Sequence, residues 1–163
     1  MTATLPHAPV ALAPAPAGDA TADQPPFSQI LREATQRAHT DAESATFVHQ
    51  LMAGELDAHA YARLAAQLHP VYEALECSTV TDPVRDHFDD PRLHRLEALE
   101  RDLAHLIGPD WRSKEPPRPA ARAYAEHIAS VSRSTPAFVG HHYTRYLGDL
   151  SGGQAISRRV SQH

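Results

Sequence analysis

Apolar residues recur at intervals of three and four from Phe27 onward, which is the spacing that one face of an α-helix requires. The first run covers residues 28–52 and predicts a helix with Ser28 as its N-cap. The run allows a bend near Ser44. Gly54 should end the helix, because glycine readily adopts the left-handed conformation that follows a helix.

A second run, over residues 58–75, follows Asp57, whose carboxylate can accept hydrogen bonds from the free amides at a helix start. Pro70 lies within this run and should kink the helix, because it has no N–H and its ring clashes with a preceding carbonyl. A third run, over residues 93–106, has five leucines on one broad face and should end at Gly108.

Two further helices are predicted toward the C-terminus. One covers residues 119–133, with Tyr124, Ile128 and Val131 directed inward. The other begins at Pro136, and its apolar positions are Phe138, Val139, Tyr143, Leu147, Leu150, Ile156 and Val160.

The connections between these runs are short. Residues 77–90 form a polar connection, and residues 109–118 form a proline-rich loop. No alternation of period two competes with the helical pattern, and no internal repeat is present. The pattern therefore predicts an all-α protein, a helical bundle with short connections.

The chain has 163 residues, the size of a single domain. Residues 1–26 are rich in alanine and proline and lack the basic start and apolar run of a signal peptide. We expect them to be a disordered tail before one domain, residues 27–163. No stretch approaches the ~20 apolar residues that span a bilayer, so no membrane anchor is expected and the default location is cytoplasmic.

The formal net charge of −5 argues against a nucleic-acid partner. Cys77 is the one cysteine, so no intrachain disulfide can form, which fits a reducing compartment. Cys77 is either a small, partly buried residue at a helix end or a catalytic thiol, and a lone cysteine at such a place is more often the first.

The stretch "YTRYLGDLSGGQAI", residues 143–156, places three glycines in a predicted helix. Gly148 and Gly152 are four residues apart and share one face, where a flat ligand or another backbone could approach the helix axis. Each glycine costs about 1 kcal/mol of helix stability relative to alanine, so Gly148, Gly152 and Gly153 together favour a kink. The alternative is that "SGGQ" simply ends the helix, although "AISRRV" resumes a helical pattern.

Three polar residues are candidates for chemistry. Asp149 lies four residues after Arg145, as in a surface ion pair, but it could instead hold water against a bound ligand. His39 lies near the apolar stripe of the first helix and is either a packing residue or an axial metal ligand. Glu43, one turn later, could accept a hydrogen bond from the ring or be a solvated charge.

Two motifs are specific enough to indicate a family. "LREATQRAHTDAESATF" and, much later, "HHYTRYLGDLSGGQ" resemble haem oxygenase of the biliverdin-producing kind. "AAQLHPVYEALE", "HRLEALERDLAHLIGPDW" and "RPAARAYAEHI" fall in the same order and spacing as in that family. The resemblance covers residues 27–160 and implies a bundle that holds haem between a proximal helix and a kinked distal helix.

The resemblance also implies roles for the candidate residues. His39 matches the axial ligand of the haem iron, and Glu43 matches a pocket residue near it. Asp149 matches the distal carboxylate that organises water above the iron. The other matches are Tyr72 and Arg145, which support that water network; Gly148, Gly152 and Gly153, which lie against the porphyrin; and Tyr143 and Arg32, near the propionates.

The implied activity is oxidative cleavage of haem to biliverdin, carbon monoxide and ferrous iron, with haem as both cofactor and substrate. O2 and electrons are required. The electrons must come from an external reductase or a ferredoxin-type donor, because no G-x-G-x-x-G fingerprint is present.

The chain departs from the family pattern in two places. The family continues with further helices, whereas this sequence stops at "SRRVSQH", where Arg158 and Arg159 do not match the family's later basic positions. Gln36 replaces a lysine near the propionates. We therefore expect weak propionate anchoring, together with exposed apolar faces that make the isolated chain self-associate.

Two other functions stay open. One is a haem-binding module without full turnover. The other is a His-rich bundle that binds zinc or a di-metal centre, because the chain has 12 histidines. Against the second, His141 and His142 point about 100° apart on a helix and cannot chelate one ion together. The Glu-x-x-His pairs of carboxylate di-metal bundles are not repeated in this sequence.

Overall fold

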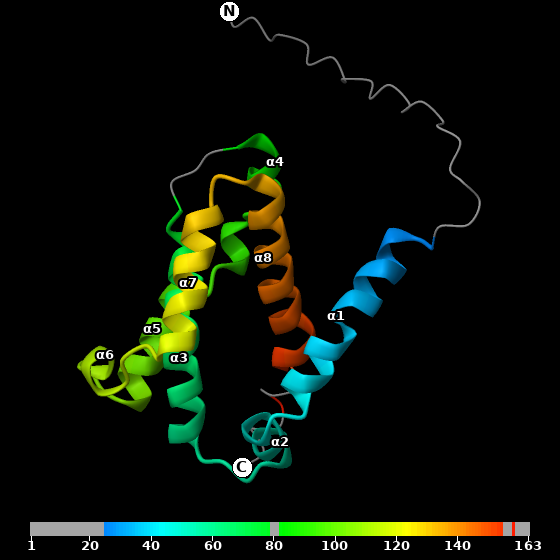
Figure 1. The fold of residues 1–163 in the computed structure, drawn as a ribbon. Helices are drawn as coiled ribbons and strands as arrows, with labels where there is room; N and C mark the ends of the chain where they lie inside the picture. Colours follow the sequence, from blue (N-terminus) through cyan, green and yellow to red (C-terminus); the bar gives the residue numbers. More distant parts are fainter. Residues whose placement is uncertain (1–24, 79–81, 155–157, 159–163) are drawn as a thin grey trace, which may run out of the picture. The chain divides into compact units, whose positions relative to one another are not determined.

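The computed structural model describes residues 25–78, 82–154 and 158, and every regular element in that part of the chain is helical. The predicted all-α class is therefore confirmed (Figure 1). The helices are α1 (Phe27–Glu43), α2 (Thr46–Ala53), α3 (Ala58–Glu76), α4 (Pro83–Asp86), the 3₁₀ turn η1 (Pro91–Leu93), α5 (Leu96–Leu106), α6 (Trp111–Lys114), α7 (Pro119–Val131), α8 (Thr135–Gly148) and the π-helical η2 (Asp149–Gly153).

The chain divides into two compact units, one that ends at Asp41 and one that starts at Ala42. The first unit contains α1 as far as Asp41, and the second contains all the later helices. The expected tail, residues 1–26, lies almost wholly outside the described residues, as do Ile156, Arg159 and Val160.

The first predicted helix is two helices in the structure. α1 begins at Phe27, where the Pro26 carbonyl accepts hydrogen bonds from the next free amides, so the prediction that Ser28 caps it is wrong. The helix is interrupted where a bend was expected, because α1 ends at Glu43 and α2 starts at Thr46. Gly54 ends α2 as predicted, with φ 73° and its amide bonded to the carbonyls of Gln50 and Leu51.

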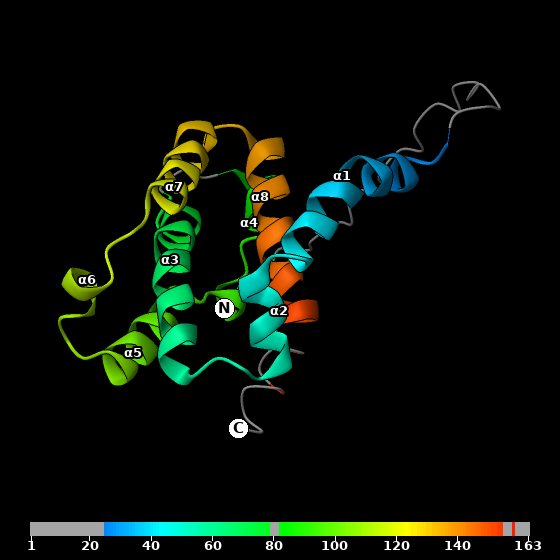
Figure 2. The same cartoon turned by 60° about the horizontal axis from the view of Figure 1, so that its bottom comes forward.

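α3 is the central helix of the second unit. Asp57 caps it as predicted, by accepting a 2.7 Å hydrogen bond from the amide of Ala60, and the helix runs through Pro70 to Glu76. α3 packs against α5, α7 and α8. In both views α5 and α6 lie on one side of α3 and α8 on the other (Figures 1 and 2).

The core lies where these helices meet. Leu75 of α3, Leu103 of α5, Ile128 of α7 and Phe138 of α8 are all almost completely buried. Burying such a side chain stabilises the fold by roughly 1.5–3 kcal/mol each. The rest of the core cluster is Ala65, Ala66, Val71, Tyr72, Leu99, Trp111 and Tyr146.

A polar cluster joins α3 to α5 and α6 beside this core. Buried His69 of α3 places Nε2 3.0 Å from the carboxylate of Glu100, which also accepts a hydrogen bond from Arg112. The ring of His69 meets Trp111 edge-on at 4.9 Å between centroids. Trp111 is only 4% exposed, and its burial in the core holds α6 in place. The sequence indicated this segment to be a loop.

The predicted polar connection at residues 77–90 also contains a helix. The Asp82 carboxylate accepts hydrogen bonds from the amides of Val84 and Arg85, which starts α4. Arg85 is 1% exposed, and its guanidinium lies 3.6 Å from the centroid of the Phe138 ring. The Arg85 side chain also donates a 3.0 Å hydrogen bond to Ser78. Composition alone did not indicate that an arginine here would be buried under an aromatic ring.

α8 turns a different face inward from the one that the apolar pattern indicates. Phe138, His142 and Tyr146 are buried, whereas Tyr143 is 57% and Leu147 44% exposed. α7 shows the same effect, with Ile128 buried as predicted but Tyr124 37% exposed, so the prediction that Tyr124 faces inward is wrong. None of the described helices is both long and apolar enough to cross a membrane.

We predict that His142 makes the second unit less stable in acid. The imidazole lies 4.3 Å from the Tyr146 ring between centroids, and burial lowers the pKa of His142 below its ordinary 6.5. As the pH falls through 6.5, His142 therefore binds a proton in the unfolded chain before it does so in the folded chain. The free energy of unfolding should fall between about pH 7 and pH 5.5.

Urea unfolding followed by circular dichroism at several pH values measures this. His142→Phe should reduce the pH dependence, whereas the control His105→Gln, at an exposed position of α5, should keep it. An equal slope in wild type and His142→Phe would contradict the assignment.

Candidate functional site

The glycine-rich stretch does not end the helix. α8 passes at Gly148 into η2, which has π-helical geometry, and Gln154 and Arg158 are again helical. π-Turns inside α-helices are rare and occur frequently at functional sites. The interpretation that "SGGQ" is a helix terminus is therefore wrong.

The three glycines are not needed for an unusual backbone. Among the described glycines only Gly54 and Gly108 have positive φ. A Cβ at Gly152 would meet nothing within 4 Å, and one at Gly148 would meet only the Arg145 guanidinium, at 4.0 Å. These glycines therefore leave one face of the helix bare over open space.

That bare face borders a cavity of about 650 Å³. A largely apolar part of the wall comes from α3, and α5 with its N-cap Arg95 contributes further lining residues. The lining residues are Tyr61, Leu64, Ala65, Leu68, Tyr72, Arg95, Leu99, Asp102, Arg145, Gly148, Asp149, Gly152, Gly153 and Gln154.

A hydrogen-bonded triad of Tyr72, Asp149 and Arg145 forms part of this wall. The Tyr72 hydroxyl donates to one Asp149 oxygen, and Arg145 Nη2 donates to the other at 2.7 Å. Both charged side chains are partly buried, and Tyr72 is almost fully buried. Burial, together with the Asp149 carboxylate, raises the pKa of Tyr72 well above its ordinary value, so Tyr72 remains a proton donor to Asp149 at neutral pH.

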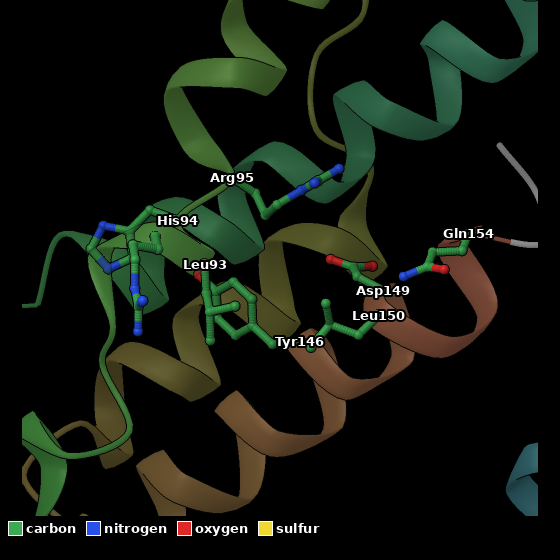
Figure 3. Close-up of a pocket in the computed structure, with 8 residues that line it drawn as sticks. Leu93, His94, Arg95, Tyr146, Asp149, Leu150 and Gln154 are labelled. Carbon is green, nitrogen blue, oxygen red and sulfur yellow. The ribbon is translucent and has the colours of Figure 1, made fainter.

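A smaller cavity of about 210 Å³ also borders Asp149 (Figure 3). Arg95, Asp149 and Gln154 line both cavities. In the close-up the Gln154 amide points toward Asp149 (Figure 3). Asp149 therefore borders both cavities.

Glu76 holds two residues that line the smaller cavity, Tyr146 and Arg95. Its carboxylate accepts a 2.5 Å hydrogen bond from the Tyr146 hydroxyl and two more from the amides of Arg95 and Leu96. Glu76 thereby fixes the first turn of α5 against the helix that carries Asp149. Sequence reasoning missed Glu76, Arg95 and Gln154, because nothing in their local pattern distinguishes them from surface residues.

The structure thus brings together six of the ten predicted site residues: Tyr72, Arg145, Gly148, Asp149, Gly152 and Gly153. Tyr143 and Glu43 are exposed in the second unit and do not line the cavity. His39 and Arg32 lie on α1 in the first unit.

The other candidate sites receive less support. Within the described residues, no three His, Cys, Asp or Glu side chains gather as a metal site. Cys77 is exposed at the end of α3, and partial desolvation and the carboxylates of Glu73 and Glu76 raise its pKa. A raised pKa disfavours the thiolate that a nucleophile needs.

The geometry suits a flat, largely apolar ligand with a reactive centre near a carboxylate. One face of the ligand could lie against bare helix backbone and the other against the aliphatic wall of α3. Asp149, held by Tyr72 and Arg145, could then place water or a proton beside that ligand.

Comparison with known proteins agrees with this geometry. The family model described as "Heme oxygenase" matches residues 25–163. Human "Heme oxygenase 1" is 40% identical over 140 residues, which cover 81% of this chain and 48% of the human protein. "Heme oxygenase 1" of the cyanobacterium Synechocystis sp. is 36% identical over 137 residues, covering 82% of this chain and 57% of that protein.

A solved structure of heme oxygenase-1 from Synechocystis sp., in complex with heme, superposes with a TM-score of 0.70 at 34% identity. The match covers 82% of this chain and 62% of the solved one. The chain spans about half the length of the curated relatives it matches. The matched region includes the glycine-lined cavity and its triad, and the chain belongs to the haem oxygenase family.

Proposed function

We propose that this chain binds haem and cleaves it oxidatively to biliverdin, carbon monoxide and ferrous iron. The observation that carries the proposal is the bare glycine face of α8 and η2, which borders a cavity beside a hydrogen-bonded carboxylate. Relatives named heme oxygenase and a heme-bound structural neighbour support it.

The cavity suits a haem in size and in chemistry. Its volume of about 650 Å³ lies within the range of small-molecule sites, roughly 300–1,000 Å³. Leu64, Leu68 and Leu99 supply apolar contacts for the ring. The open space at Gly152 would be filled by any larger side chain, so glycine there makes sense if a ligand occupies it.

His39 would hold the haem iron, as the neutral imidazole that is the usual proximal ligand of haem proteins. Glu43 would lie near that ligand, and Arg32 and Tyr143 would approach the propionates. When bound, haem supplies the iron at which O2 is reduced and is itself the ring that is cleaved. These four assignments rest on the family motifs.

Asp149 would hold water on the distal side and pass protons to it. Tyr72 donates to one carboxylate oxygen and Arg145 to the other, so the carboxylate cannot rotate freely. Arg145 also has a buried Nε without a hydrogen-bond partner among the described residues. A buried donor without a partner is costly, so an ordered water in the loaded site would satisfy it.

Electrons would come from a separate protein, either an external reductase or a ferredoxin-type donor. We also infer a cytoplasmic location, where such donors are available. Because the donor protein would carry any nucleotide cofactor, this chain needs no nucleotide-binding site of its own.

The first test is a haemin titration of the purified chain, followed by ascorbate with an iron chelator. Wild type should show a saturating Soret band that then decays into biliverdin absorption. Asp149→Ala should bind haemin but form about 100-fold less biliverdin, because its proton source is missing. Glu126→Ala, an exposed carboxylate of α7, is the matched control and should behave as wild type.

Each result has a definite meaning. Normal biliverdin formation by Asp149→Ala would contradict the role of this carboxylate. Saturable binding without decay in wild type would favour the alternative of a haem-binding module without full turnover.

His39→Ala should remove the axial ligand and change the visible and electron paramagnetic resonance spectra of the ferric complex. His49→Ala, at an exposed position of α2, is the control and should leave both spectra unchanged. Imidazole added to the His39→Ala complex should restore the wild-type spectrum, because it can occupy the vacated position. An unchanged spectrum in His39→Ala would reject His39 as the ligand.

Substitutions at two glycines, Gly152 and Gly140, distinguish an effect on the space left for a ligand from an effect on helix stability. A Cβ meets nothing within 4 Å at either Gly152 or Gly140, but only Gly152 lines the cavity. Gly152→Leu and Gly140→Leu should each stabilise the haem-free chain by up to about 1 kcal/mol. Only Gly152→Leu should weaken haemin binding, by about tenfold or more, because its side chain enters the cavity. Equal affinities of the two variants would contradict a haem site on this face.

A further inference from the structure

Two histidines meet on the hairpin of α7 and α8, outside the cavity lining. The rings of His127, on α7, and His141, on α8, lie 5.3 Å apart between centroids and are nearly perpendicular, at 82°. The hydroxyl of Tyr124, one turn before His127, lies 3.1 Å from Nδ1 of His141. His141 cannot chelate an ion together with its neighbour His142, but the fold brings His127 next to it.

We propose that His127 and His141 form a two-imidazole site for a divalent transition metal such as Zn²⁺, Ni²⁺ or Cu²⁺. Imidazole is a preferred ligand of these ions, unlike Mg²⁺ and Ca²⁺, which take oxygen ligands. The proposal does not depend on haem binding.

The ring separation agrees with shared coordination. A metal–nitrogen distance of about 2.0–2.1 Å places the ion roughly 3.2 Å from each ring centroid. Two imidazoles at 90–110° around one ion therefore have centroids about 4.5–5.2 Å apart. The observed 5.3 Å lies just above this range. The angle between the planes is not restrictive, because an imidazole can rotate about its metal–nitrogen bond.

Tyr124 orients one of the two ligands. If Nδ1–H of His141 donates to the Tyr124 oxygen, the lone pair of Nε2 is left for a metal. A second hydrogen bond of this kind, from the non-ligating nitrogen, accompanies most metal-binding histidines. His127 is exposed, and no hydrogen bond to its ring is present among the described residues, so its nitrogens are available.

Two protein ligands make this a labile site. A structural zinc site uses four ligands, whereas here water would complete the coordination. The bound ion would join α7 to α8, and α8 carries Arg145 one turn after His141. Metal binding should therefore stabilise the hairpin that bears the distal arginine.

The test is thermal unfolding of the untagged, haem-free chain with increasing NiCl2 or ZnCl2. A chelate between two helices exists only in the folded state, so the melting temperature should rise and saturate. Isolated histidines bind metal equally well in folded and unfolded chains and produce no such rise. His127→Ala should lose the rise, and Tyr124→Phe should weaken metal binding several-fold. His105→Ala, at an exposed histidine of α5, should retain the rise.

Histidine side-chain NMR provides the second measurement. At one equivalent of Zn²⁺ the ring signals of His127 and His141 should shift together, before those of other histidines. A melting temperature that does not rise, or a rise that persists in His127→Ala, would overturn the proposal. So would NMR shifts spread over many histidines, which would indicate adventitious binding only.

Discussion

The burial of α3 is the constraint on which the second unit depends. Eight of its side chains are buried, and they contact helices from three later parts of the chain. Tyr72 shows how this packing becomes a site. Its ring packs edge-on against Tyr146, 5.9 Å between centroids, and its hydroxyl reaches Asp149. The same apolar contact that stabilises the core therefore positions the hydroxyl that holds the Asp149 carboxylate.

The glycines of α8 and η2 lower the stability of the helix and keep its surface open. Three glycines cost about 3 kcal/mol relative to alanine. Burial of Phe138 and Tyr146 in the core offsets a cost of that size. The helix can therefore continue through the glycines as a π-turn, because the packing of these two side chains holds it. Gly148 and Gly152 leave part of the helix surface bare beside the cavity.

Several buried or partly buried polar groups pack against α8 and the start of α5. Glu76 ties Tyr146 to the first turn of α5, and Arg85 lies under Phe138. His142 is buried between Phe138 and Tyr146, and its Nε2 has no hydrogen-bond partner among the described residues. Such groups contribute little net stability, but they make the packing sensitive to protonation and to bound water.

The sequence by itself determined the helical class, the caps at Asp57 and Gly54, and the glycine and aspartate run of the site, because these depend on residues close together in the chain. The sequence did not indicate α4 and α6, whose short helices depend on Asp82 as a cap and on burial of Trp111. It also pointed to the wrong face of α8, since Tyr143 and Leu147 are exposed while His142 is buried. Only the tertiary structure brought Tyr72 to Asp149, Arg95 to the two cavities, and His127 to His141. Tyr72 and Arg95 are 77 and 54 residues before Asp149, and His127 is 14 residues before His141, so no local pattern of charge or hydropathy could specify these contacts.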